Sequence, residues 1–176
     1  MKSFITGIAL ILISIFMLIF QIDNYNSRLN SIFLKYCADE ASNSALLMYD
    51  ELKFKEGKKI FVEEEGIKAI ENVIKNYLKT DNNLMPTSDS YWKDKITYTA
   101  YFFDDDMNCK KYINGIYTDN FNFTYPYLYE DEQLSYKKTV EKANVIVTID
   151  AGKSTYRMFF LVEPKIIRSS AYEYEV

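Results

Sequence analysis

The feature that most constrains this chain is the 19-residue run from Phe4 to Ile22, which contains no charged side chain. As an α-helix rising ~1.5 Å per residue, this run would be about 28 Å long, close to the hydrocarbon thickness of a bilayer. Lys2 precedes the run and Asp23 follows it, a charge distribution that favours an N-terminus in the cytoplasm. We therefore expect residues 1–22 to be a single-pass anchor in the cell membrane, with the lipid bilayer as a partner and the C-terminal domain extracellular.

A cleaved secretory signal is the alternative interpretation of the same run, because its apolar region would look similar. Its cleavage site would differ, since signal peptidase needs small residues on either side of one intervening position. The residues from Gln21 to Asn26 contain no such small-x-small triplet. The sequence therefore favours an uncleaved anchor.

The composition excludes several classes of function. The chain has 176 residues, of which 48% are hydrophobic and 26% charged, which suits one ordinary domain. Its net charge of -4 gives no electrostatic basis for binding nucleic acid. Histidine is absent, so the chain lacks the commonest general base and the commonest transition-metal ligand. We expect a non-catalytic protein without cofactor, metal or nucleic-acid partner.

Residues 23–56 are predicted to continue the anchor as an extracytoplasmic stem helix. Beyond the anchor, apolar residues recur every three or four positions as far as Leu52, and no Gly or Pro occurs between Asp23 and Gly57. Small residues crowd the stretch from Cys37 to Ala45, and small side chains permit another helix or a sheet to approach closely. The residues expected to pack against other helices are Leu29, Ile32, Ala41, Ala45 and Met48.

Residues 57–176 are expected to form a head domain with an antiparallel sheet, which makes the fold class α+β. An apolar stripe predicts a second, shorter helix at about residues 64–79. Alternating β-branched and aromatic residues predict strands at 96–103, 145–149, 156–162 and 166–174, the last three as a meander that turns first at 151–153. Fourteen of the 29 aromatic residues lie between Tyr91 and Tyr136. Within that stretch, residues 112–117 and 121–129 fit either strands or an aromatic-rich loop.

Two short patterns suggest chemistry but fit it incompletely. Asp104–Asp106 resembles the first half of a calcium loop, yet Cys109 and Gly115 occupy the positions where such a loop needs a glycine and a bidentate acid. We therefore expect a solvated acidic turn. Residues 90–93 and 135–138 match the S-x-x-K spacing of some serine acyl-transfer enzymes, but no S-D-N or K-T-G element accompanies them.

Cys37 and Cys109 are the only cysteines. Outside the cytoplasm an even number of cysteines permits a disulfide, which here would close a loop of about 70 residues. Two separately buried thiols are the alternative, because cysteine behaves as a small hydrophobic residue. The sequence leaves both alternatives open.

A membrane helix that continues into an amphipathic stem, followed by a short helix and a strand-rich head, resembles the plan of pilins and pseudopilins. The stretch from Tyr36 to Leu46 is similar to the Ala- and Asp-containing stretch after the anchor in minor pseudopilins of tight-adherence (Flp) pili, the TadE and TadG types. The segment from Ile166 to Tyr174 also resembles the terminal strand of such proteins. The resemblance implies a pilin-like fold and other pilin-like or assembly-machinery subunits as partners.

One difference from pilins concerns processing. Prepilin peptidase substrates carry a glutamate five residues after the cleavage glycine, whereas Gly7 is followed by Ile8 to Leu12, all apolar. An unprocessed accessory subunit therefore fits better than a major pilin.

These observations together predict a non-catalytic, membrane-anchored subunit of a pilus or secretion system that acts through lateral packing of its stem helix and through a Tyr-rich head. Its surplus of Ile, Lys, Asn and Tyr is typical of AT-rich genomes and suggests a Gram-positive bacterium. Two alternatives stay open: a conjugation or secretion scaffold of the VirB8 type, and an anchored extracytoplasmic ligand-binding domain, which a pocket lined by Tyr and Phe would favour.

Overall fold

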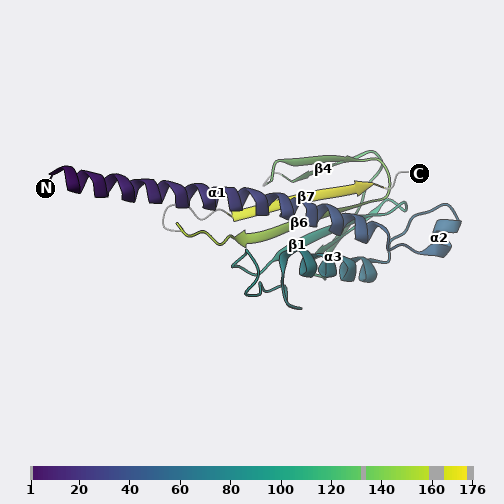
Figure 1. Ribbon diagram of the computed structural model, residues 1–176. Helices are drawn as coiled ribbons and strands as arrows, with labels where there is room; N and C mark the ends of the chain where they lie inside the picture. The colour runs from purple at the N-terminus through teal and green to yellow at the C-terminus, as the bar shows by residue number, and fades with distance from the viewer. Residues whose placement is uncertain (1, 132–133, 159–164, 174–176) are drawn as a thin grey trace.

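The computed structural model describes residues 2–131, 134–158 and 165–173, and its dominant feature is a helix that extends far beyond the head (Figure 1). This helix, α1 (Lys2–Leu46), is 45 residues long. Two further helices follow, α2 (Glu51–Lys55) and α3 (Glu63–Leu78). The second of these confirms the helix predicted at about residues 64–79.

The predicted continuation of the stem helix to residue 56 is wrong, because α1 ends ten residues earlier. After Leu46 the chain turns into an extended piece that pairs with a second one: the Asp50 amide donates to the Ile60 carbonyl, and the Val62 amide donates to the Met48 carbonyl, each at 2.9 Å. Asp50 then caps α2 by accepting the amides of the second and third residues beyond it. The apolar residues between Leu46 and Gly57 therefore belong to an extended segment and to α2, and not to a continuation of α1.

The head is built on a five-stranded antiparallel sheet with the strand order β3-β2-β1-β6-β7. A separate two-stranded hairpin consists of β4 and β5. The antiparallel head of an α+β fold is therefore confirmed, and the aromatic-rich stretch that fitted either strands or loop is largely strand. The strands are β1 (Thr97–Phe103), β2 (Asn108–Ile113), β3 (Ile116–Asn122), β4 (Tyr127–Asp131), β5 (Tyr136–Val140), β6 (Asn144–Lys153) and β7 (Lys165–Glu173).

The predicted C-terminal meander differs from the structure. β6 pairs directly with β7, with Thr148 opposite Ser169, and residues 151–153 belong to β6 instead of forming a turn. The ladder is irregular there because Gly152 has a positive φ of 61° and approaches Asp94 so closely that a Cβ would lie 2.6 Å from the Cβ of that residue. The predicted strand at 156–162 is not formed at residues 156–158, and its remainder lies outside the described residues.

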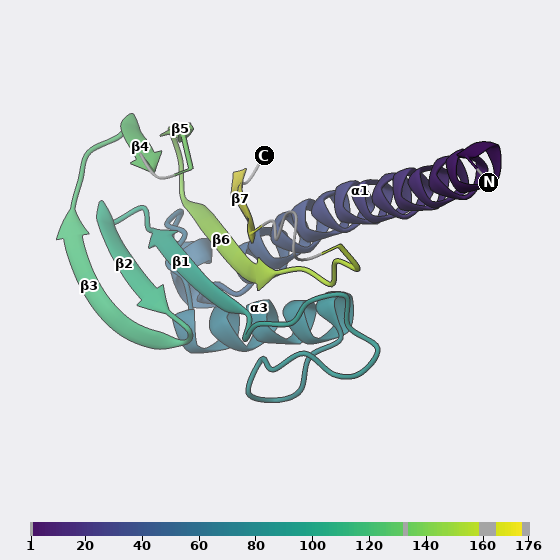
Figure 2. The same cartoon turned by 90° about the vertical axis from the view of Figure 1, so that its left-hand side faces the viewer.

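The sheet lies between two layers (Figures 1 and 2). The C-terminal half of α1 and the whole of α3 cover one face, and the β4–β5 hairpin covers the other. Alternate residues of β1 serve the two faces: Ala100 and Phe102 belong to the helix-side core, whereas Phe103 belongs to the hairpin-side core. The second core is aromatic, and Phe103 contacts the rings of Phe121, Phe123, Tyr127 and Tyr129 there.

Candidate functional site

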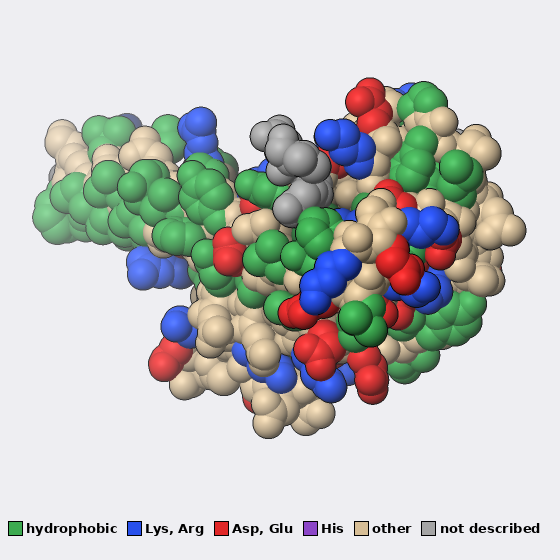
Figure 3. Space-filling model, turned by 90° about the vertical axis from the view of Figure 1, so that its right-hand side faces the viewer, with side chains coloured by type: hydrophobic (Ala, Val, Ile, Leu, Met, Phe, Trp, Pro, Cys, Tyr) green, Lys and Arg blue, Asp and Glu red, His purple; other side chains and the backbone are tan. Residues whose placement is uncertain are grey.

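The N-terminal half of α1 is a bare apolar helix. By length and composition it is able to cross a membrane, and none of its most apolar 18-residue window is buried in the head. Figure 3 shows this part covered with hydrophobic side chains, whereas acidic and basic side chains are interspersed over the head. The predicted anchor thus has a segment of the required length that the described part of the head leaves uncovered.

The head first meets α1 directly after this apolar run, at Asp23. Its side chain is only 3% exposed, and its Oδ2 accepts the backbone amides of Arg157 at 2.8 Å and Met158 at 3.0 Å. Next to it, the Tyr156 hydroxyl donates to Asn24 Oδ1 at 2.8 Å. A buried carboxylate needs such donors to offset its lost hydration. From the sequence, Asp23 is predicted only to flank the anchor with a charge, and no pattern in the sequence identifies its backbone partners.

The inner face of the stem packs on α3 and the sheet. Ala41 and Ala45, two of the residues predicted to pack, are fully buried in the helix-side core. The approach is close enough that a Cβ on Gly66 of α3 would lie 2.8 Å from Phe102 Cε1 and 3.7 Å from Ala45 Cβ. The small residues therefore serve a contact within the fold. The buried residues of α1 beyond Asp23 are Leu34, Cys37, Ala38, Ala41, Ser42, Ala45 and Leu46.

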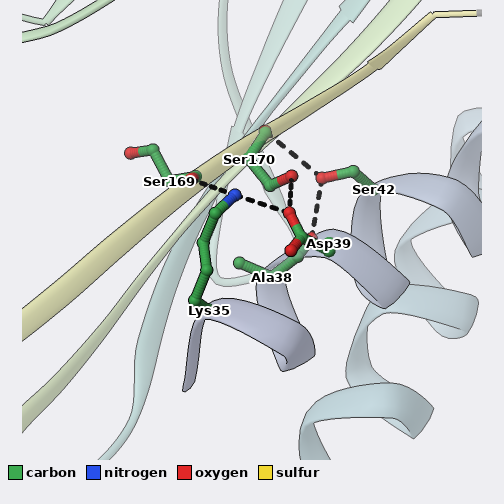
Figure 4. A network of polar contacts seen from close by, with 6 residues as sticks. All are labelled: Lys35, Ala38, Asp39, Ser42, Ser169 and Ser170. Atoms are coloured by element: carbon green, nitrogen blue, oxygen red, sulfur yellow. Dashed lines mark hydrogen bonds and ion pairs between the residues drawn. The ribbon is translucent and has the colours of Figure 1, made fainter. Parts of the chain in front are cut away.

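Polar side chains join the stem to the last strand over several helical turns, and Figure 4 shows the middle of this contact. Asp39 accepts both the Lys35 ammonium and the hydroxyl of Ser170 on β7. Lys35 also donates to the Ser169 carbonyl at 3.2 Å, and Ser42 donates to the Ser170 carbonyl at 3.2 Å. One turn nearer the anchor, the Arg168 guanidinium donates to the hydroxyl of Ser31. We call these contacts the stem–β7 ladder; they hold the strand against the helix.

The outer face of the stem is apolar and exposed. Tyr25, Ile32, Phe33 and Tyr36 define this outer stem face; Tyr36 is 57% exposed. Their spacing of three, four and seven residues places them along one side of α1, in line with Ile22 of the apolar run. Of the other residues predicted to pack, Leu29 and Met48 are half-buried and Ile32 is exposed. The predicted packing set thus divides between two faces of the helix.

A hollow of about 350 Å³ lies beside the outer stem face. It brings together aromatic rings from three elements, since Tyr77 comes from α3 and Tyr172 from β7. These two rings are about half exposed, as are those of the stem. The lining residues are Phe33, Tyr36, Asp39, Glu40, Asn43, Tyr77 and Tyr172.

At the opposite end of the head, the acidic turn between β1 and β2 is not solvated as predicted. Asp104 is buried, and its Oδ1 accepts the Phe61 amide at 3.1 Å. Asp105 accepts the Lys59 amide at 2.7 Å, and Asp106 pairs with Lys58 at 2.6 Å. Burial raises the pKa of Asp104 to about 7. The three carboxylates bind the segment that precedes α3, and no local pattern in the sequence indicates this partner.

A second cavity, of about 380 Å³, opens beside this turn. The Lys59 ammonium lies 4.8 Å from the ring centroid of Tyr49 and 5.8 Å from that of Phe61. Burial lowers the pKa of Lys59 to about 8. Basic, acidic and aromatic side chains all line the space: Phe54, Gly57, Lys59, Asp105, Tyr125, Glu141, Lys142 and Ala143.

The remaining candidate residues have structural surroundings. Cys37 and Cys109 are free thiols buried on opposite faces of the sheet, so the alternative of a disulfide is not formed. In the first S-x-x-K match, the Ser90 hydroxyl donates to the Leu78 carbonyl at 2.6 Å. In the second, Lys138 pairs with Glu173 at 3.4 Å.

Comparisons with protein-family models, with curated proteins and with solved structures find no match to this chain.

Proposed function

We propose that this protein is a non-catalytic, membrane-anchored assembly subunit, of the minor pseudopilin type, whose stem associates laterally with the helices of other subunits. The outer stem face carries the proposal. It is an exposed apolar stripe that continues the apolar run without a break, while the opposite face of the same helix is occupied by the head. Exposed apolar surface of this kind is typical of protein contacts.

The connection between stem and head supports an assembly role. The head is joined to α1 at Asp23, through the stem–β7 ladder and through the core around Ala41 and Ala45. Because these contacts extend along the helix, a partner that fixes the stem also fixes the head. A structural subunit needs this property, whereas a flexibly tethered domain lacks it.

Some aromatic residues of the head are buried and others are exposed, so a partner is expected to contact only the exposed ones. Many of the rings between Tyr91 and Tyr136 fill the hairpin-side core. The exposed rings near the stem are instead those of Phe33, Tyr36, Tyr77 and Tyr172. Tyrosine suits a contact surface because it buries a large area at small entropic cost. We therefore place the partner's helix along the outer stem face and this aromatic hollow.

The test compares the outer stem face with an exposed site on α2, in the source organism. A photo-crosslinking residue replaces Ile32 on the outer stem face, or the exposed Leu52 of α2 as the matched control, in a deletion strain complemented with the full chain. Crosslinks from position 32 to pilin-like proteins, with none from position 52, support the proposal, as does loss of surface filaments when residues 4–22 are removed. Normal filaments in the deletion strain and no crosslinks to pilin-like proteins overturn it. Crosslinks to a conjugation channel favour the VirB8-type scaffold.

The cavity beside Lys59 favours a second candidate, an anchored ligand-binding domain. Its volume of about 380 Å³ lies within the range of small-molecule sites, and the rings of Phe54 and Tyr125 contribute to its walls. The measurement is a thermal-shift screen of small amphiphilic compounds, repeated on a Glu141→Trp variant, which adds a large side chain at an exposed residue of the cavity lining. A ligand that stabilises the wild type but not the variant supports this function. Equal stabilisation of both proteins places binding elsewhere.

A further inference from the structure

We propose that the end of the head formed by residues 154–158 rests on the membrane surface, where Arg157 and Arg28 bind the phosphate groups of anionic phospholipids. This inference rests on the membrane anchor of the proposed function and adds a second, headgroup-binding contact to it. The main observation in support of this contact is that the head meets α1 at Asp23, directly after the apolar run.

The depth of the contact follows from the length of the apolar run. Phe4 to Ile22 as a helix matches the ~30 Å hydrocarbon core, so Asp23 lies where hydrocarbon gives way to headgroups. The headgroup layer adds about 5–7.5 Å on each side, the rise of roughly three to five helical residues. Asp23 to Arg28 therefore spans this layer. Because Asp23 accepts the Arg157 and Met158 amides, those two residues lie at the same depth.

The 154–158 segment is a fixed part of the head. The Thr155 amide donates to the Tyr91 carbonyl at 2.8 Å, and Ser154 forms a bridge with Trp92. The Tyr156 side chain is buried and bonded to Asn24. The segment therefore cannot withdraw from the membrane surface without breaking these contacts or tilting the whole helix.

The exposed groups at this depth suit anionic headgroups. Asp23 is enclosed by the segment, so its carboxylate is shielded from lipid phosphates. The side chains of Arg157 and Arg28 are exposed, and within the described residues neither guanidinium forms an ion pair. Guanidinium groups bind phosphate bidentately, and arginine side chains extend from a membrane boundary toward the headgroups. Tyr25, also exposed, is a residue type enriched at this interface.

The test locates the segment relative to the headgroups in the full chain, reconstituted in nanodiscs of phosphatidylcholine alone or mixed with phosphatidylglycerol. A spin label is attached to Thr155→Cys, to Ile116→Cys on the edge strand β3 as a distant control, or to Phe20→Cys in the anchor. Both native cysteines are buried, so they do not compete for the label. A nickel chelate carried on a lipid headgroup should shorten the spin relaxation time of the label at position 155 strongly and that of the label at position 116 weakly. Oxygen dissolved in the hydrocarbon should shorten the relaxation time of the label at position 20.

The arginines are tested by hydrogen exchange of residues 154–158. Phosphatidylglycerol should slow this exchange in the wild type, the effect should be lost in R28Q/R157Q, and R28K/R157K should retain part of it. If the headgroup chelate does not relax the label at position 155 while oxygen relaxes the label at position 20, the headgroup contact is wrong and the membrane anchor is supported. If position 20 is also outside the bilayer, the anchor itself is wrong. Relaxation at 155 with no dependence on phosphatidylglycerol or on the arginines overturns the phosphate contact.

Discussion

At the scale of single residues, two acidic side chains are buried, each about 3% exposed. Asp23 and Asp104 each accept backbone amides from a segment far away in the sequence. In the sequence both look like ordinary solvated charges, because neither local spacing nor composition shows which amide will face a carboxylate. The sequence predicted the small residues of the stem correctly as a packing feature, since size and period are local properties. It did not predict the carboxylate partners, since these depend on how distant segments meet.

The burial of Asp104 predicts an unusual dependence of stability on pH. Its pKa is raised from 3.8 to about 7, with burial as the first cause and the Phe61 amide opposing it. The fold therefore favours the protonated form, so the contribution of Asp104 is greatest below about pH 4 and is lost as the pH rises through about 7. Asp104→Asn keeps an oxygen acceptor for the amide and removes the charge. It should raise the free energy of unfolding at about pH 8 by an amount on the order of 2–4 kcal/mol, and should change it little at about pH 4.

The measurement is urea unfolding of the full chain in detergent at the two pH values. Asp106→Asn is the matched control, because its carboxylate lies on the same turn and is exposed. A stabilisation of equal size at both pH values would contradict the assignment to Asp104 ionisation.

The two cysteines give a second prediction at this scale. Burial raises the pKa of Cys37 to about 12 and also raises that of Cys109, and both side chains are fully buried. Thiol reagents act on the exposed thiolate, so neither residue should react in the folded chain, and both should react in denaturant. Mass spectrometry after maleimide treatment, with and without urea, measures this. A native mass lower by two hydrogens, restored by reductant, would show instead a disulfide that the structure lacks.

At the scale of elements, the sequence predicted the regular segments where one local period dominates. α3, β1 and the central part of β6 lie where periodicity placed them. The boundaries were missed where a tertiary partner decides them: α1 ends at Leu46 because the next residues pair with 60–62, and β6 runs through Gly152 because that residue accepts the close approach of Asp94. The period of the apolar residues identifies which of them share one face of an element, but not which other segment packs on that face.

Gly66 tests the closeness of the contact between α3 and the sheet. In an exposed helix interior, Gly→Ala stabilises by about 1 kcal/mol. Here the new Cβ would lie 2.8 Å from Phe102 Cε1, and the Phe102 ring is itself held between Phe61 and Tyr112. Gly66→Ala should therefore destabilise the head by ~1–3 kcal/mol, as overpacking does. Thermal unfolding measures the change, with Glu64→Ala on the first turn of the same helix as a control. An increase in melting temperature would show that Phe102 is free to move.

At the scale of the whole molecule, α1 has three consecutive parts. The first is an exposed apolar run, the second is the point at Asp23 where the head first contacts the helix, and the third is a stem with one face packed on the head and one face exposed. This division makes stability and association separable. The inner face contributes to folding, so substitutions there unfold the head. None of the outer stem face residues belongs to the cores formed by the described residues, so substitutions there should affect only contacts with partners.

Tyr36→Asp is the sharpest test of that separation. Tyr36 is 57% exposed on the outer stem face, so replacing it should change the melting temperature of the purified chain little. A carboxylate at the centre of a buried helix contact is costly, because it must be desolvated without a partner. The variant should therefore lose the crosslinks from position 32 to neighbouring subunits and reduce surface filaments. Leu52→Asp is the matched control: Leu52 is an exposed apolar residue of α2, at the opposite end of the head from the anchor, and its replacement should leave crosslinks and filaments intact. If both variants assemble as the wild type does, the outer stem face is not the site of lateral packing; if both fail, the loss reflects the added charge and not the position of Tyr36.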